Sequence, residues 1–306
     1  MFKKMHTVAR QVGEIVVGKD LQVRQALTCL LAGGHLLVED VPGVGKTTLA
    51  HALAISLGLR FNRVQFTSDL LPADVAGISV YEREKNGFVF HPGPIFTQVL
   101  LADEINRATP KTQSGLLEAM EERQVSADGV TRALPSPFFV IATQNPSHQV
   151  GVFPLPESQL DRFLMCLSLG YPDPASERAL LMGEDRRALL KSLPAAMTPA
   201  ELAAAQRGLR AIHTAPALID YVHALVQASR QNGSFAEGLS PRAALALVQA
   251  ARAWAALEGR DHVIPEDVQA VLVPVCAHRL RPLKSAHGVA LASRDLVLRL
   301  QQSVPL

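Results

Sequence analysis

The segment DVPGVGKTT, residues 40–48, has the residue types of a loop that holds phosphate groups. Gly43 and Gly45 allow a tight turn in which backbone N–H groups point inward at phosphate oxygens. Lys46 adds a cation for the β- and γ-phosphates, and the hydroxyl of Thr47 is a suitable ligand for Mg²⁺. The predicted nucleotide-binding residues are Pro42, Gly43, Val44, Gly45, Lys46, Thr47 and Thr48.

Asp40 departs from the general pattern, which has glycine at its position. Aspartate tolerates left-handed backbone angles better than most residues, so we expect the loop to close around it. A strand-like run at 35–39 precedes the loop and a helical stretch at 47–57 follows, which is the context that a phosphate loop requires. The alternative is a glycine-rich turn that contains GKT by chance, and such a turn would not need a strand before it and a helix after it.

A pair of acids, Asp103 and Glu104, follows the apolar run 99–102. Ligands of parallel α/β sheets bind at the carboxyl ends of the strands. Hydrolysis of a nucleotide requires a carboxylate for Mg²⁺ and a base for water. Asp103 would hold Mg²⁺ through water and Glu104 would activate the attacking water, although a strand ending in a solvated acidic turn is the simpler alternative.

Asn145 ends another apolar run, 138–143, and is followed by Pro146. Its amide could touch the γ-phosphate or the attacking water. Asparagine before proline is also ordinary turn chemistry, so the residues alone leave both readings open.

Short apolar, β-rich runs must position these side chains. We predict strands buried on both faces at 35–39, 61–66, 99–102, 138–143 and 163–169. Helical stretches, including 47–57 and 110–122, separate most of them, which indicates an α/β fold with a parallel sheet. Asn86-Gly87 and Asp128-Gly129 predict two β-hairpins, near 79–91 and 124–134.

The composition changes near Tyr171, where strand-like runs stop and alanine-rich helical patterns begin. Thr198 starts a capping box, and Ser240 precedes a proline at the start of a further helix. We therefore predict an α/β domain over 1–171 and an all-α domain over 172–306.

The overall composition excludes several classes of protein. A net charge of +2 gives no reason to expect nucleic acid or an acidic membrane as a partner. The basic segment 278–284 is short and lacks interleaved aromatic residues, which is typical of a solvated helix end. The sequence has no apolar run of membrane-spanning length, no signal-peptide pattern, and three isolated cysteines that fit a reducing compartment, so we expect a cytoplasmic protein.

Five segments together resemble the MoxR family of AAA+ ATPases. They are DVPGVGKTTLA, LLADEINRATPKTQSGLLEAMEERQV, VIATQNP, LPESQLDRF and LSPRA, and the likeness runs from about Val17 to about Leu283. The resemblance implies an AAA+ P-loop core with a parallel five-stranded sheet, hairpin insertions and an all-α lid. It also implies ATP and Mg²⁺ as ligands and a ring, usually a homohexamer.

The resemblance assigns further roles by position. Lys46 and Thr47 match Walker A, and Asp103 and Glu104 match Walker B. Asn145 matches sensor 1.

Two arginines of the later segments also match. Arg162 in LDRF matches the arginine finger that reaches a neighbour's γ-phosphate, and Arg242 in SPRA matches sensor 2. Arg242 lies just inside a helix start, where a cation is unfavourable unless an anion such as phosphate is near. Alone, it could equally be solvated, and Arg162 could form a surface ion pair. Arg107 is a further candidate for the subunit interface.

The resemblance implies a motor that acts on other proteins, as a chaperone for maturation or assembly, often with partners that carry von Willebrand factor A domains. Two other classes stay open. One is an AAA+ nucleic-acid motor or loader, and the other is a nucleotide-gated scaffold with little turnover. Glu104 argues against the scaffold, and the near-neutral charge argues against the nucleic-acid motor.

Overall fold

The computed structural model describes residues 3–145, 151–183, 186–231, 233, 235–283 and 292–305. A parallel sheet lies at its centre, with the strand order β2-β5-β8-β1-β9. Its strands are β1 (Leu36–Glu39), β2 (Phe61–Gln65), β5 (Val99–Asp103), β8 (Phe139–Gln144) and β9 (Met165–Leu167). The predicted α/β fold with a five-stranded parallel sheet is confirmed.

Side chains of alternate strand residues enter two apolar cores, one on each face of the sheet. Leu36 and Val38 of β1 pack with the helices α1 (Lys3–Ile15), α2 (Asp20–Leu31) and α3 (Lys46–Ser56). Leu37 packs on the other face with α5 (Pro110–Glu122). This alternation follows from the two-residue period of a strand, and it explains why the central strands read as continuous apolar runs.

The edge strand β2 differs from its prediction. We expected burial on both faces for 61–66, but Asn62, Arg63 and Gln65 are exposed and Val64 is the one buried residue of β2. An edge strand has a neighbour on one side only, so it can carry polar side chains near the ligand-binding end of the sheet. β9 is also shorter than the run 163–169 that predicted it.

The helices α1 and α2 were not predicted. In α1, Met5, Val8, Val12 and Ile15 are buried at helical spacing and pack against the neighbouring helices. The signal for this helix was present in the sequence as a 3.6-residue period without a strong cap.

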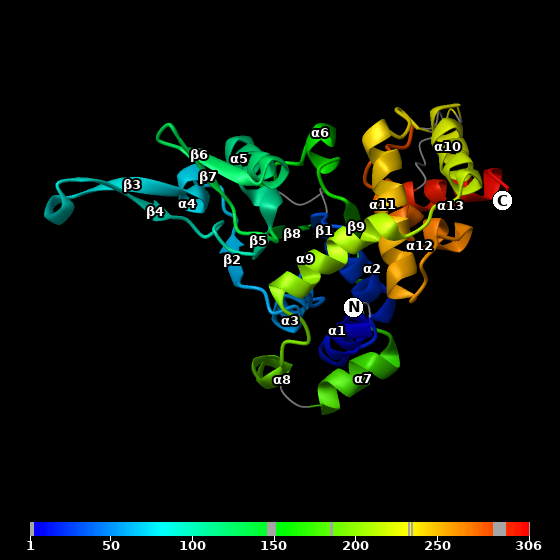
Figure 1. Cartoon of the computed structure of the whole chain (residues 1–306), viewed down its shortest axis with the longest axis horizontal. Coiled ribbons are helices and arrows are strands. Elements are labelled where there is room, and N and C mark those ends of the chain that lie inside the picture. Colours follow the sequence, from blue (N-terminus) through cyan, green and yellow to red (C-terminus); the bar gives the residue numbers. More distant parts are fainter. Residues whose placement is uncertain are drawn as a thin grey trace.

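Two antiparallel hairpins leave the sheet, at the places where Asn86-Gly87 and Asp128-Gly129 predicted them. They are β3 (Gly77–Glu82) with β4 (Gly87–Pro92), and β6 (Gln124–Ala127) with β7 (Val130–Ala133). Asn86 and Asp128 have φ values of 45° and 53°, as such turns require. Figure 1 shows the β3–β4 hairpin projecting from one end of the molecule, opposite the helices α10–α13.

Apart from loops and turns, the remainder of the described chain is helical. Its α-helices are α4 (Pro72–Ala76), α6 (Glu157–Leu160), α7 (Pro174–Met182), α8 (Arg186–Ser192), α9 (Pro199–Gly208), α10 (Pro216–Gln231), α11 (Pro241–Leu257), α12 (Pro265–Cys276) and α13 (Ser293–Ser303). Thr198 forms the capping box with Glu201, and Ser240 Oγ accepts a bond from Ala243 N at 3.1 Å. No helix in the described residues is long and apolar enough to cross a membrane.

Several contacts join the segment after Tyr171 to the sheet domain. Lys19 Nζ donates to Tyr171 O at 2.7 Å, and Ala196 N donates to Ser56 O at 2.8 Å. The helix α12 packs against β9, and α11 packs against α2. The domain boundary near Tyr171 therefore stays a prediction, while the residues on its two sides share one apolar core.

Candidate functional site

The loop between β1 and α3 is open toward solvent at its glycines. Gly43 and Gly45 have φ values of 86° and 96°, which favour glycine. A Cβ atom added to either would meet nothing within 4 Å, so there is free space beside the loop. The first turn of α3 follows directly at Lys46, and its backbone N–H groups are available to an anion.

Lys46 is buried and its side chain folds back over the loop. Nζ donates to the backbone oxygen of Asp40 at 2.6 Å and to Oδ1 of Asn145 at 3.3 Å. Burial lowers the pKa of Lys46, while the charges of Asp40, Asp103 and Glu104 oppose that shift. An ammonium has three donors, so these two bonds leave one for a ligand.

Asp40 has a different role from the one that we expected from its position in the loop sequence. It is not among the described non-glycine residues with positive φ, so the expected need for left-handed angles is wrong. Its carboxylate instead accepts bonds from Val41 N at 2.8 Å, Ser168 Oγ at 3.0 Å and Gly170 N at 2.6 Å. Asp40 thereby ties the end of β1 to the segment after β9.

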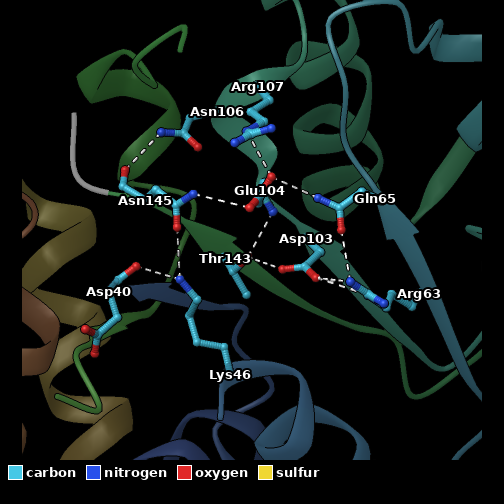
Figure 2. A network of polar contacts seen from close by, with 10 residues as sticks. All are labelled: Asp40, Lys46, Arg63, Gln65, Asp103, Glu104, Asn106, Arg107, Thr143 and Asn145. Carbon is cyan, nitrogen blue, oxygen red and sulfur yellow. Dashed lines mark hydrogen bonds and ion pairs between the residues drawn. The ribbon is translucent and has the colours of Figure 1, made fainter. Parts of the chain in front are cut away.

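Asp103 lies at the end of β5 and is held from two sides (Figure 2). Thr143 Oγ1 donates to its Oδ1 at 2.5 Å. Arg63 of the edge strand donates to its Oδ2 from Nε at 3.0 Å and from Nη2 at 2.7 Å. The sequence reasoning did not find Thr143 and Arg63, although both lie on parallel strands beside β5.

Glu104 has a strained backbone and a fully engaged carboxylate. Its φ is 57°, and its N–H donates to Thr143 Oγ1 at 2.9 Å. Oε2 accepts from Gln65 Nε2 at 3.0 Å and pairs with Arg107 Nε at 2.9 Å. Oε1 accepts from Asn145 Nδ2 at 3.3 Å. Arg107, considered above for the subunit interface, thus pairs with a carboxylate of its own chain.

Asn145 joins the loop to the acidic pair. Its Oδ1 accepts from Lys46 and its Nδ2 donates to Glu104, as Figure 2 shows. Asn106 Nδ2 holds its backbone oxygen at 3.0 Å. The amide therefore makes side-chain contacts within the polar cluster, beyond what a turn would need; Pro146, which follows it, lies outside the described residues.

The residues present fit a nucleotide with Mg²⁺. In the described part of the chain, no three His, Cys, Asp or Glu side chains gather as a metal site of their own. Magnesium typically takes one or two carboxylates and completes its shell with substrate phosphates and water. Thr47, in the first turn of α3 beside the open loop, and Asp103, at the end of β5, offer that partial set of ligands.

Arg162 and Arg242 lie apart from this cluster and meet on one carboxylate. Arg162 Nη1 pairs with Glu121 Oε2 at 3.1 Å, and Arg242 Nη2 pairs with Glu121 Oε1. Arg162 Nη1 also donates to Leu117 O at 2.7 Å. Both arginines line a hollow of about 350 Å³ that also contains Arg123 and Arg279.

This hollow is at the amino ends of the strands. His35, just before β1, contacts Met120 O through Nε2 at 3.1 Å, and it lines the hollow beside Glu121. Lys46 contacts Asp40, at the other end of β1. A strand rises about 3.3 Å per residue, so His35 and Asp40 are roughly 16 Å apart along β1. The structure therefore brings Lys46, Asp103, Glu104 and Asn145 together and places Arg162 and Arg242 elsewhere.

Comparison with known proteins agrees with this arrangement. The protein-family model described as "ATPase family associated with various cellular activities (AAA)" matches residues 35–165. A second family model, described as "AAA lid domain", matches residues 227–297. A crystal structure of a proposed ATPase from Cytophaga hutchinsonii has a TM-score of 0.89 at 34% identity, covering 99% of this chain and 95% of that one. The fold and the loop thus define an AAA+ ATPase with a helical lid.

Relatives narrow the class further. "Chaperone MoxR1" of Mycobacterium tuberculosis is 41% identical over 99% of this chain and 83% of its own. "Protein MoxR" of Paracoccus denitrificans is 36% identical over 87% and 85%. "Uncharacterized protein YeaC" of Bacillus subtilis is 43% identical over 96% and 92%. The chain belongs to the MoxR family of AAA+ ATPases.

Proposed function

We propose that this protein hydrolyses ATP in the presence of Mg²⁺ and couples hydrolysis to the remodelling of partner proteins. The observation that carries the proposal is the convergence of Lys46, Asp103, Glu104 and Asn145 beside the open loop at Gly43 and Gly45. This cluster contains a phosphate-binding cation, a carboxylate for the metal, a base and an amide that bridges them.

Each residue has a part in an in-line attack of water on the γ-phosphate. The loop N–H groups and Lys46 bind the phosphates, and Glu104 orients the water and accepts its proton. Asn145 lies between Lys46 and Glu104 and orients the water or the γ-phosphate. Bound Mg²⁺ neutralises charge on the phosphates, and Thr47 together with Asp103 would hold it.

The polar cluster must rearrange before it can act. The carboxylate of Asp103 accepts hydrogen bonds from Arg63, and that of Glu104 is engaged by Gln65 and Arg107. A carboxylate that already accepts two donors on one oxygen is a poor base for a water molecule. We therefore expect nucleotide binding to exchange these contacts for contacts with phosphate and water.

Arg162 and Arg242 act on a neighbouring subunit in this proposal. Both lie at the amino edge of the sheet, about one strand length from the loop of their own chain. This position argues against a contact between Arg242, which the resemblance matches to sensor 2, and the nucleotide of its own chain. Glu121 pairs with both guanidinium groups until a neighbour's phosphate takes its place, as an arginine finger in trans requires.

This arrangement needs a ring, and we propose a homohexamer in the cytoplasm. One relative is named a chaperone, which supports a client protein as the object of the motion. A partner with a von Willebrand factor A domain is proposed from the family resemblance alone. A nucleic-acid motor is the second candidate, since a relative named "Holliday junction branch migration complex subunit RuvB" is 26% identical over 78% of this chain.

Mixing of variants tests the shared site. Arg162→Ala lacks the finger and Lys46→Ala lacks the phosphate cation, so each supplies the half-site that the other lacks. We expect each variant alone to hydrolyse ATP poorly and the mixture to recover part of the activity. Mixing Lys46→Ala with Glu104→Gln serves as the control and should recover nothing, because both lesions lie in one half-site.

Three outcomes would count against the proposal. No recovery in the first mixture, with rings confirmed by light scattering, would mean that Arg162 acts within its own chain or only structurally. Hydrolysis that rises on addition of DNA and falls steeply with salt would favour the nucleic-acid motor. Binding of ATP without turnover in the wild type would favour a gated scaffold.

A further inference from the structure

The guanidinium of Arg279 lies buried at the junction of the lid and the sheet domain. Arg279 follows α12, within the segment matched by the lid model, and its side chain is 5% exposed. We predicted a solvated helix end for 278–284, and for Arg279 this is wrong. A buried arginine needs partners for its donors, and these partners point to its role.

All of its partners but one belong to the segment that carries Arg162. Nε donates to Asp161 Oδ1 at 2.7 Å, and Nη2 donates to Asp161 O at 3.2 Å and to Phe163 O at 2.7 Å. Nη1 donates to Leu164 O at 3.1 Å and to Val275 O of α12. The preceding residue, His278, contacts Phe163 O through its ring atom Nε2 at 3.1 Å.

We propose that Arg279 is a positioning residue that fixes the loop 161–164 from the lid and so aims Arg162 at the neighbouring subunit. Arginine suits this role because its planar fork reaches several acceptors at once. It holds the backbone on both sides of Arg162, at Asp161 and at Phe163. A shift of α12 relative to the sheet would therefore move Arg162.

The inference rests on the proposed function of Arg162 and adds a link from the lid to the shared site. If α12 shifts when its own subunit binds or releases nucleotide, Arg279 carries that shift to the finger. The half-site offered to the neighbour would then depend on the state of the donor's lid. The five donated bonds of one side chain give this link its stiffness.

Arg279→Lys tests the role, since lysine keeps the charge and loses the fork. We expect its ATP hydrolysis at saturating ATP to fall at least tenfold, with ATP affinity unchanged. Mixing it with Lys46→Ala should restore activity, because its own loop is intact and the partner supplies a well-placed Arg162. Mixing it with Arg162→Ala should restore nothing, since both lesions impair the finger half-site.

Arg281→Ala is the matched control, because this nearby arginine is exposed and pairs with Glu157. We expect it to keep wild-type activity. If Arg279→Lys fails to bind ATP or to fold, Asp161→Asn is measured in the same mixtures, since it weakens the same contact without removing the guanidinium.

Full activity of Arg279→Lys would overturn the inference. So would a loss of activity that Lys46→Ala cannot rescue while the pair of Arg162→Ala and Lys46→Ala does recover. If that reference pair also fails to recover, the failure belongs to the proposed trans role of Arg162 itself.

Discussion

Arg63 donates two hydrogen bonds to one oxygen of Asp103, from Nε at 3.0 Å and from Nη2 at 2.7 Å. The two residues come from the neighbouring strands β2 and β5, whose ends lie side by side. Thr143 occupies the other oxygen of the same carboxylate. Asp103 therefore has to release an arginine before it can hold Mg²⁺ directly or through water.

We expect Arg63→Ala to lower the Mg²⁺ concentration that gives half-maximal ATP hydrolysis. A charge-assisted hydrogen bond contributes about 1.5–3 kcal/mol, and the solvent exposure of Arg63 reduces this contribution. The Mg²⁺ concentration for half-maximal hydrolysis should therefore fall several-fold. A Mg²⁺ titration of the hydrolysis rate measures it. Arg60→Ala, an exposed arginine outside this contact, is the control. A higher Mg²⁺ requirement in Arg63→Ala would show that Arg63 supports the metal site.

Lys46→Ala and Glu104→Gln should separate ATP binding from turnover. Lys46 supplies the cation for the phosphates, so its removal should weaken ATP binding strongly. Glutamine in place of Glu104 keeps the shape and loses the base, so ATP should bind as before and remain intact. Equilibrium binding of a fluorescent ATP analogue and a phosphate-release assay measure the two effects. Hydrolysis by Glu104→Gln at the wild-type rate would show that another group is the base.

Asp40→Gly should weaken ATP binding about tenfold or more, because three donors lose their carboxylate and one charge-assisted bond alone contributes about 1.5–3 kcal/mol. Asp40→Asn should have an intermediate effect, since its one carbonyl oxygen can serve Val41 or Gly170 but not both. Binding of the same ATP analogue measures the series. Tighter binding by Asp40→Gly would mean that repulsion between the carboxylate and phosphate outweighs the anchoring of the loop.

Acid should destabilise the fold through His35. Burial lowers the pKa of His35 to about 4, against an ordinary value of 6.5. Between these two values the unfolded chain binds a proton at His35 and the folded chain does not, so stability falls as the pH drops from 6.5 to 4. The full loss is about 3 kcal/mol at 1.36 kcal/mol per pKa unit.

Urea unfolding at a series of pH values measures this effect. The ring of His35 accepts a bond from Val140 N at Nδ1 and donates to Met120 O from Nε2, which leaves no place for a second proton. His35→Gln should flatten the dependence over that range. The pKa of the buried His278 is also lowered, but His278 is present in both proteins and cancels in the comparison. Parallel curves for the two proteins would assign the acid sensitivity to other groups.

Contiguous residues were sufficient to predict the loop, the acidic pair and the hairpin turns. In each case one short stretch determines the local geometry. Gly43 and Gly45 set the turn before α3, and Asn86 and Asp128 set the hairpins through positive φ. The apolar runs of the central strands and the capping box at Thr198 are local in the same sense, because each depends on side chains a few residues apart in the sequence.

The tertiary structure decided which distant residues complete and restrain the site. Arg63 and Gln65 reach Asp103 and Glu104 only because β2 lies beside β5, and Thr143 does so from β8 on the other side. Strand order depends on how whole segments pack, which no local pattern encodes. Isolated residues could therefore not reveal that these carboxylates are held by arginine, glutamine and threonine.

The placement of the arginines follows the same division. The motif around Arg162 could be found in the sequence, but its meeting with Arg242 on the carboxylate of Glu121 depends on where α11 docks. Arg279 read as a solvated cation because its neighbours in the chain are basic, and the packing of α12 against β9 buried it. The sequence by itself determined the chemical groups of this ATPase. Only the order of the strands and the packing of the lid on the sheet decided which of these groups meet, because the contacts join residues up to 121 positions apart in the chain.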